Sequence, residues 1–390
     1  MSTDSWFSRI PQLRAPVSFG ARPTGERLAR VRRSPQFSAG ALRNPVPTRR
    51  FAPGAPLGLL RDALSPDRYR RRPVAAVPVH RLTPAQLAQP PATGLRLTWL
   101  GHATVLAEIG ASRVLFDPVW GERCSPFAAF GPRRLHPNPI PLAELGPVDL
   151  VVVSHDHYDH LDLPTVRQLA RTGAQFAVPL GVGAHLERWQ VAAGQITELD
   201  WHESAELAGL EVTAVPARHY CSRGPRLSAC QLWASWVVAG PAHRLYHSGD
   251  TGWFPGFSAI GAQYGPFDAT LMQIGAYSRW WPDVHLTPEQ GVHAHQELGG
   301  ELLLPVHWAT FDLAPHPWEE PVERTLAAAR AAGVTVAVPR PGVPFEPAAP
   351  PALRLWWRAV AAQPRAGAPD VRQPLADSGR TVSEGAAPGV

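Results

Sequence analysis

Residues 155–160 carry the densest group of potential metal ligands in the chain. They follow an apolar run, Val151-Val152-Val153, and their pattern is His155-x-His157-x-Asp159-His160. A packed core does not accommodate so many imidazoles and carboxylates, because each buried polar group needs a partner, and a bound metal ion satisfies several of them at once. This donor set suits zinc and also iron or manganese. We therefore predict a transition-metal site at this segment.

Polar residues that can bind metal also follow other predicted strands. The run Leu150–Val153 is typical of a buried strand. The remaining residues at such strand ends are His102, Asp117, His219, Asp250 and His307. Ligands at several strand ends converge only if those ends share one edge of a layered structure. We therefore predict an α/β fold in which two mixed β-sheets pack face to face, with helices on the outer faces.

Seven of these residues make the predicted ligand set: His155, His157, Asp159, His160, His219, Asp250 and His307. Four ligands are enough for one tetrahedral zinc, so seven suit two ions. Asp250 lies between glycines, which allow its carboxylate to reach between two ions. A pair of divalent ions lowers the pKa of a bound water to about 7, so no nucleophilic side chain is required. Ser154 and Ser248 lack any triad partners, and we assign them no catalytic role.

The two ends of the chain differ in composition from its middle. Residues 1–96 contain 17 arginines against four acidic residues, a net charge of +13, whereas the remainder has 20 arginines against 28 acidic residues, or −8. A basic arm on an acidic body suggests an anionic partner such as a phospholipid surface, and the alternative is a solvated disordered arm. We expect the first fifty residues to be extended or poorly ordered, with short helices at Leu57–Leu64 and Thr83–Ala88.

The location expected from the sequence is cytoplasmic, with peripheral membrane contact through the arm. Three cysteines, at positions 124, 221 and 230, are too few for a disulfide framework. The amino-terminal residues lack the pattern of a signal peptide, and no run approaches 18 apolar residues. The body carries no strip of alternating aromatic and basic residues, so a nucleic-acid partner is not expected. A homo-oligomer remains open.

Motifs beyond the metal ligands resemble those of a known family. They are Thr98-Trp-Leu-Gly-His-Ala-Thr104, Asp117-Pro118-Val-Trp, Gly131-Pro-Arg-Arg134, Val153-Ser-His-Asp-His-Tyr-Asp-His-Leu-Asp162, Gly249-Asp-Thr-Gly252, Gly265-Pro-Phe-Asp268, Ile274-Gly-Ala-Tyr277 and His307-Trp-Ala-Thr-Phe311. Over residues 95–340 the chain resembles the metallo-β-lactamase superfamily, and within it the branch of N-acylphosphatidylethanolamine-hydrolysing phospholipases D. The resemblance implies an αβ/βα sandwich and a binuclear zinc site. It also implies hydrolysis of a phosphodiester to phosphatidic acid and an N-acylethanolamine.

The resemblance also implies roles for individual residues. One zinc ion takes His155, His157 and His219, the other takes Asp159, His160 and His307, and Asp250 bridges them. Asp117 and His285 match positions near the reacting phosphate, so the implied catalytic residues are Asp117, Asp159, Asp250 and His285. Composition and the extent of the resemblance together predict three parts: a partly irregular Arg/Pro-rich arm (1–94), a hydrolase domain (95–345) and a disordered Pro/Ala/Gly-rich tail (346–390).

Three other functions remain open at this point. A lactonase resembling the ascorbate-6-phosphate lactonases needs the same ligands, so the ligands cannot choose between the two reactions. The segments Gly265–Asp268 and Ile274–Tyr277 favour the phospholipase D branch. A nuclease is disfavoured by the acidic body. A non-catalytic metal-bound interaction protein is disfavoured because seven ligands still leave a position for water.

Overall fold

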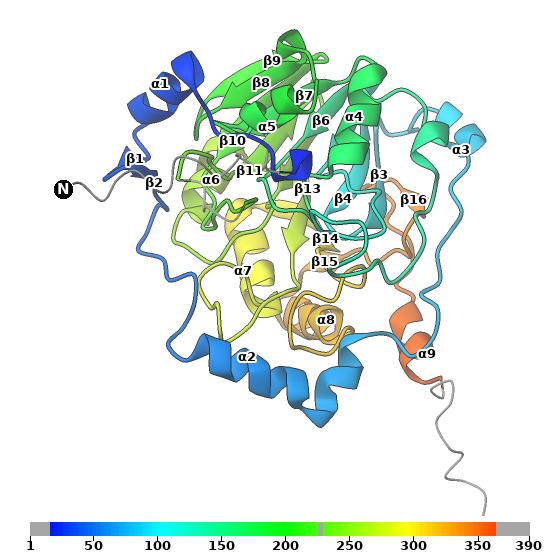
Figure 1. Cartoon of the computed structure of the whole chain (residues 1–390). Helices are drawn as coiled ribbons and strands as arrows, with labels where there is room; N and C mark the ends of the chain where they lie inside the picture. The colour runs from blue at the N-terminus through cyan, green and yellow to red at the C-terminus, as the bar shows by residue number, and fades with distance from the viewer. Residues whose placement is uncertain (1–15, 225–228, 364–390) are drawn as a thin grey trace, which may run out of the picture.

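Two seven-stranded β-sheets packed face to face form the body of the protein in the computed structural model (Figure 1). The structure describes residues 16–224 and 229–363. Both sheets contain parallel and antiparallel neighbours. The prediction of two mixed sheets with helices outside them is therefore confirmed.

The first sheet has the strand order β16-β3-β4-β5-β6-β7-β8. Its strands are β3 (Leu95–Gly101), β4 (Thr104–Ile109), β5 (Ser112–Phe116), β6 (Leu150–Val152), β7 (Gln175–Pro179), β8 (Ile196–Leu199) and β16 (Pro344–Phe345). The strands β3, β4 and β5 pair antiparallel, and the tight turn between β4 and β5 uses Gly110 at a φ of +59°. The next three strands run parallel to β5, so the carboxyl ends of β5 and β6 lie at the same edge.

The second sheet has the strand order β15-β14-β13-β12-β11-β10-β9. Its strands are β9 (Ser204–Leu207), β10 (Leu210–Val215), β11 (Ser235–Ala239), β12 (Arg244–His247), β13 (Phe267–Gln273), β14 (Gly300–Val306) and β15 (Thr335–Val336). The strands β12 to β15 are parallel, and β9 to β12 are antiparallel neighbours. The sequence analysis did not identify β9, whose burial is only partial because it is an edge strand.

The main hydrophobic core lies between the two sheets. Trp99 and Val105 from the first sheet and Trp236 and Leu304 from the second belong to one cluster of buried side chains. Fully burying an apolar side chain of this size contributes about 1.5–3 kcal/mol. The strands read as continuous apolar runs because helices cover their outer faces as well.

The helices pack on the outer faces of both sheets. Outside the first sheet lie α4 (Leu163–Arg171) and α5 (Gly183–Arg188), and outside the second lie α6 (Phe257–Tyr264), α7 (Pro288–Leu298) and α8 (Glu320–Ala332). Helix α7 begins with a capping box between Thr287 and Gln290. The sequence analysis did not identify α6. Short 3-10 helices lie at Val17–Phe19, Pro66–Arg71, Leu142–Glu144 and Ala193–Gln195.

The amino-terminal segment is more regular than expected. It forms α1 (Gly25–Arg33), β1 (Phe37–Ser38), β2 (Ala41–Leu42), α2 (Ala55–Leu64) and α3 (Pro84–Ala88), of which only α2 and α3 were predicted. Val31 and Leu42 are buried in the main core, and Arg27 pairs with Glu187 and Glu198 at 2.8 and 2.5 Å. Residues 16–50 therefore pack against the body, which differs from the expected extended or poorly ordered arm. The first 15 residues lie outside the described part.

The carboxyl-terminal segment differs from the expected disordered tail up to residue 363. Helix α9 (Trp356–Ala361) buries Trp356, Trp357 and Val360 in the main core. The Trp357 indole N–H donates to Glu323 at 2.7 Å, which fixes α9 to α8. The remainder of the expected tail, residues 364–390, lies outside the described residues. Among the described helices, none is long and apolar enough to cross a bilayer.

Candidate metal centre

Both sheets send metal-binding side chains to the same edge of the sandwich. His102 follows β3 and the segment 155–160 follows β6 in the first sheet. His219, Asp250 and His307 follow β10, β12 and β14 in the second. The structure thus brings together residues that are up to 205 positions apart, and the centre lies between the two sheets.

All seven predicted ligands lie in this centre, and together with His102 they form two groups. The first group is His155, His157, His219 and Asp250, and the second is His102, Asp159, His160 and His307. Within each group the potential ligand atoms lie within 4.8 Å of one another. The division matches the assignment implied by the resemblance, except that His102 joins the second group.

Asp250 connects the two groups through its two carboxylate oxygens. Oδ1 lies 3.3 Å from His160 Nε2 and 3.1 Å from His307 Nε2, both in the second group. Oδ2 lies 3.9 Å from His155 Nε2 and 3.7 Å from His219 Nε2, both in the first group. A carboxylate in this position can bind one cation with each oxygen.

Glycine at position 249 permits this close approach. Gly249 has a φ of +52°, and a Cβ there would meet the Ser154 side chain at 2.4 Å. The turn after β12 therefore packs directly against the end of β6, which holds Asp250 beside the histidine segment.

In three histidines of the centre, the Nδ1 atom makes a hydrogen bond that fixes the orientation of the ring. The Nδ1–H of His160 donates to Asp117 at 2.7 Å, and that of His219 donates to the Val284 carbonyl at 2.8 Å. Ser154 Oγ donates its one proton to Asp117, so it accepts from His155 Nδ1 at 2.9 Å. In each ring Nε2 is left as the atom that faces the centre, as metal-binding histidines require.

The centre contains buried polar atoms without hydrogen-bond partners, which is the observation expected of a metal site. They include His160 Nε2, His307 Nε2 and Asp250 Oδ1. Burial lowers the pKa of His307, but Asp250 and Asp159 outweigh it and raise that pKa to about 9. Burial, followed by the neighbouring histidines His160, His157 and His219, lowers the pKa of His155 well below its usual range. The donor set therefore fits divalent cations, which would balance the buried carboxylates and satisfy the unpartnered nitrogens.

Asp117 lies behind the ligand His160, in the buried part of the structure. Its side chain is fully buried and accepts hydrogen bonds from the Ser154 backbone N–H, Ser154 Oγ, His160 Nδ1 and His247 Nε2. Burial favours a neutral carboxyl, but His160 and His247 hold the pKa of Asp117 well below its usual range. The expected contact with a reacting phosphate does not agree with this location. Asp117 instead orients His160.

His285 lies beside Asp250 and His219, with its ring centroid 5.2 Å from that of His219. Its Nε2 is 3.8 Å from Asp250 Oδ2, and its Nδ1 has no hydrogen-bond partner. Burial lowers the pKa of His285 to about 4 despite the opposing charge of Asp250, so the imidazole is neutral near pH 7. It forms a third potential ligand group with Asp250 and His307. Its role as a substrate contact stays a prediction.

His102 is a member of the centre that the sequence analysis left out of the ligand set. Its Nε2–H donates to Asp159 Oδ2 at 2.9 Å. The residue has a φ of +53°, and its backbone N–H donates to Thr310 Oγ1 at 2.6 Å. The available signal was its position at the end of a predicted strand. His247, the other histidine that binds Asp117, is the last residue of β12, and it was not singled out from the sequence.

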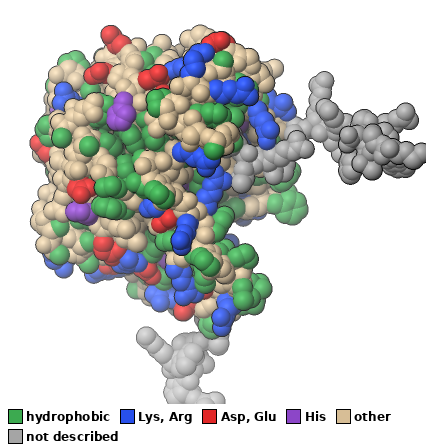
Figure 2. Space-filling view, turned by 90° about the vertical axis from the view of Figure 1, so that its left-hand side faces the viewer, with side chains coloured by type: hydrophobic (Ala, Val, Ile, Leu, Met, Phe, Trp, Pro, Cys, Tyr) green, Lys and Arg blue, Asp and Glu red, His purple; other side chains and the backbone are tan. Residues whose placement is uncertain are grey.

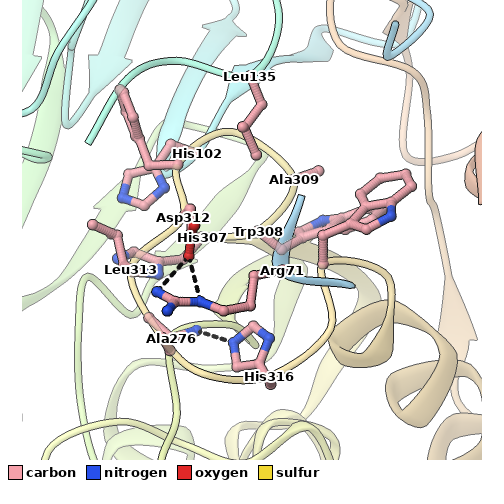
Figure 3. Close-up of a pocket in the computed structure, with 13 residues that line it drawn as sticks. Arg71, His102, Leu135, Ala276, His307, Trp308, Ala309, Asp312, Leu313 and His316 are labelled. Carbon is pink, nitrogen blue, oxygen red and sulfur yellow. Dashed lines mark hydrogen bonds and ion pairs between the residues drawn. The ribbon is translucent and has the colours of Figure 1, made fainter. Parts of the chain in front are cut away.

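A small cavity of about 20 Å³ lies next to the centre (Figure 3). His102 and His307 line one side of it, and an ion pair between Arg71 and Asp312 lines the other at 2.7 Å. A larger hollow of about 350 Å³ adjoins it at His316 and is lined by Asp62 near the end of α2 and by Asp67 and Arg68 of the 3-10 helix that follows. Residues of the amino-terminal segment therefore form part of the wall around the centre.

Comparison with known proteins gives related families and structures. Residues 112–308 match the family described as "Beta-lactamase superfamily domain", and this segment includes all seven predicted ligands. A protein of Mycobacterium tuberculosis strain H37Rv, described as uncharacterized, is 48% identical over 348 residues, 88% of this chain and 92% of the relative.

Two more distant similarities concern hydrolases. The N-acyl-phosphatidylethanolamine-hydrolyzing phospholipase D 1 of Caenorhabditis elegans is 37% identical over 251 residues, 61% of this chain and 70% of that protein. The solved structure of Igni18, a metallo hydrolase from Ignicoccus hospitalis, aligns with a TM-score of 0.50 and 25% identity. The alignment covers 65% of this chain and 98% of the Igni18 chain.

Proposed function

The chain belongs to the metallo-β-lactamase superfamily, and we propose that it is a metal-dependent hydrolase with two metal ions that cleaves a phosphodiester bond. The observation that carries this proposal is the position of Asp250, whose two oxygens face two separate groups of histidines. One ion would be held by His155, His157 and His219, and the other by Asp159, His160 and His307. The histidine-rich donor set favours zinc, with iron or manganese as alternatives.

Two divalent ions at this centre would polarise the phosphoryl oxygens and activate a water as the nucleophile. The chain's own residues fix the geometry. Asp117 holds the His160 ring, His102 holds the Asp159 carboxylate, and the Val284 carbonyl holds the His219 ring. The neutral imidazole of His285 beside Asp250 is suited to donate one hydrogen bond to substrate without adding charge.

The proposed substrate is a phospholipid diester of the N-acylphosphatidylethanolamine type. The products would be phosphatidic acid and an N-acylethanolamine. The proposal is supported by the similarity to the C. elegans phospholipase D and by the shared motifs outside the ligand set. A cytoplasmic, membrane-peripheral location is part of the same proposal.

The outer face of α2 supports contact with an anionic lipid surface. Leu57, Leu60 and Leu64 lie on one side of this helix and are 64%, 57% and 70% exposed. On its opposite side Gly58 packs against Trp280, where a Cβ would meet the ring at 1.9 Å, and Asp62 accepts from the Trp280 indole at 2.7 Å. The apolar side of α2 therefore faces solvent.

Arginines accompany this apolar row. Arg61 lies in α2, and Arg68 lies in the 3-10 helix Pro66–Arg71 that follows. In Figure 2 arginine side chains lie beside hydrophobic ones along the lower right part of the visible face. Leucines that enter the headgroup region next to arginines that pair with anionic lipids are the pattern of an interfacial helix.

The proposal is tested by an activity panel with the purified, zinc-loaded chain. The panel compares N-acylphosphatidylethanolamine, the soluble diester bis(p-nitrophenyl) phosphate and a lactone, with Asp250→Asn as the inactive control. We expect turnover of both diesters and little of the lactone. Turnover of the lactone alone would assign the protein to the lactonases, and no turnover of any substrate by metal-loaded protein would favour a non-catalytic interaction role.

A further inference from the structure

Residues 44–52, here called the strap, connect β2 to α2 along one edge of the molecule (Figure 1). The strap is tied to the loops that carry the metal centre. The Asn44 side chain donates to the His219 carbonyl at 2.8 Å and accepts from the His219 backbone N–H at 2.9 Å. The Arg49 backbone N–H donates to Asp283 at 2.8 Å, two residues before His285. The position of the strap relative to the metal centre is therefore fixed at both of its ends.

The strap places the guanidinium of Arg50 near the first ligand group. Its central carbon lies 4.8 Å from the centroid of the Tyr220 ring. The Tyr220 ring in turn lies 4.8 Å from both the His157 and the His219 rings. One aromatic ring thus separates a fixed positive charge from two of the predicted ligands.

Three other arginines near the centre, in contrast, have partners for their guanidinium groups. Arg71 pairs with Asp312, Arg218 pairs with Asp283 at 3.0 Å, and Arg223 donates to the carbonyls of Asp156 and Leu161. Within the described part of the chain, no carboxylate or carbonyl pairs with the guanidinium of Arg50. The stacking on Tyr220 holds that group in place and leaves its N–H donors available.

We propose that Arg50 binds the anionic phosphoryl group of the substrate, a role that rests on the proposed phosphodiesterase function. A guanidinium presents paired N–H donors that match two oxygens of a phosphate, and it stays charged at every working pH. Arg50 comes from the amino-terminal segment, outside the segment that matches the superfamily. The strap would therefore give this chain its preference for anionic substrates over neutral esters.

The test compares Arg50→Gln and Arg50→Lys with Arg49→Gln in the full-length, zinc-loaded protein. Arg49 is the matched control, because it is the neighbouring arginine and its contact with the body, among the described residues, is made by its backbone N–H. Each variant is assayed with bis(p-nitrophenyl) phosphate, which is anionic, and with p-nitrophenyl butyrate, which is neutral. Binding of inorganic phosphate is measured by calorimetry as a readout that does not depend on turnover.

For Arg50→Gln we expect KM for the diester and the dissociation constant for phosphate to rise about tenfold, the change that 1.4 kcal/mol produces. The kcat for the diester and the kinetics with the neutral ester should stay at wild-type values. The KM and the phosphate dissociation constant of Arg50→Lys should lie between those of the wild type and Arg50→Gln, because lysine keeps the charge and loses the paired donors. Arg49→Gln should behave as wild type.

Equal effects of Arg49→Gln and Arg50→Gln, or an unchanged phosphate affinity in Arg50→Gln, would overturn the assignment. An equal loss with the neutral ester would show that Arg50 supports the fold and does not bind the anion. If the wild-type protein fails to hydrolyse the diester, the proposed function fails, and the phosphate titration alone then decides the role of Arg50.

Discussion

Asp117→Asn should weaken metal binding without changing the contacts to substrate. Asp117 Oδ1 accepts from the Ser154 backbone N–H, and Oδ2 accepts from Ser154 Oγ, His160 Nδ1 and His247 Nε2, at 2.7–2.9 Å. An asparagine offers one oxygen and one NH₂ group. In either orientation of the amide, the NH₂ group faces at least one of these N–H donors.

The expected loss of metal affinity follows from this unfavourable contact between the amide NH₂ group and an N–H donor. A buried donor left without an acceptor costs about 1–3 kcal/mol, and the bonds that remain lose the assistance of the carboxylate charge. Because His160 belongs to the second ligand group, the loss should appear mainly as weaker binding of one metal ion. The expected reduction in affinity is about 10- to 100-fold, the range found when an outer partner of a ligating histidine is removed.

The assay measures zinc affinity by competition with a chelator, and diester turnover at low and at saturating zinc. Turnover by Asp117→Asn should recover at saturating zinc. Asp268→Asn is the control, because Asp268 pairs with His243 at the start of β13, at the opposite end of the sheet from the centre. A kcat that stays low although both ions are bound would refute the reasoning and would return Asp117 to the role of a substrate contact.

Three further results are expected. Asp250→Asn should lower kcat by at least about tenfold with the circular dichroism spectrum unchanged, because one side of the shared carboxylate is lost, and a smaller loss would show that Asp250 is not shared. Replacing Leu57 and Leu64 with serine should weaken binding to anionic vesicles about tenfold or more, while turnover of a soluble diester stays constant. Unchanged vesicle binding would show that α2 does not contact the membrane. A chelator should abolish turnover and lower Tm. Zinc at about 1,000 times its Kd should then raise the free energy of unfolding by about 4 kcal/mol. A Tm that does not change on addition of the chelator would contradict a structural contribution from the metal.

The ligand cluster could be predicted because its signal is local. The pattern His155-x-His157-x-Asp159-His160 after an apolar strand identifies four of the seven predicted ligands, two in each group. The other three follow from the rule that ligands at strand ends share an edge, and the structure brings His219, Asp250 and His307 to that edge. Short hairpins such as β4–β5 could be predicted from local patterns, whereas the pairing of β16 with β3 joins segments remote in sequence.

The contacts that could not be predicted are those between residues remote in sequence. Asp117 meets His247, which is 130 positions away, and Arg27 meets Glu187, which is 160 positions away. The segment 16–50 reads as an irregular arm because it is rich in arginine and proline. It is ordered by its partners in the body, such as His219 for Asn44, and no local pattern reveals them.

The central claim is that the chain holds two metal ions around Asp250. Elemental analysis of protein purified without chelators tests it most directly. We expect about two transition-metal ions per chain in the wild type and a clearly lower metal content in Asp250→Ala. About one ion per chain, unchanged by the substitution, would contradict it.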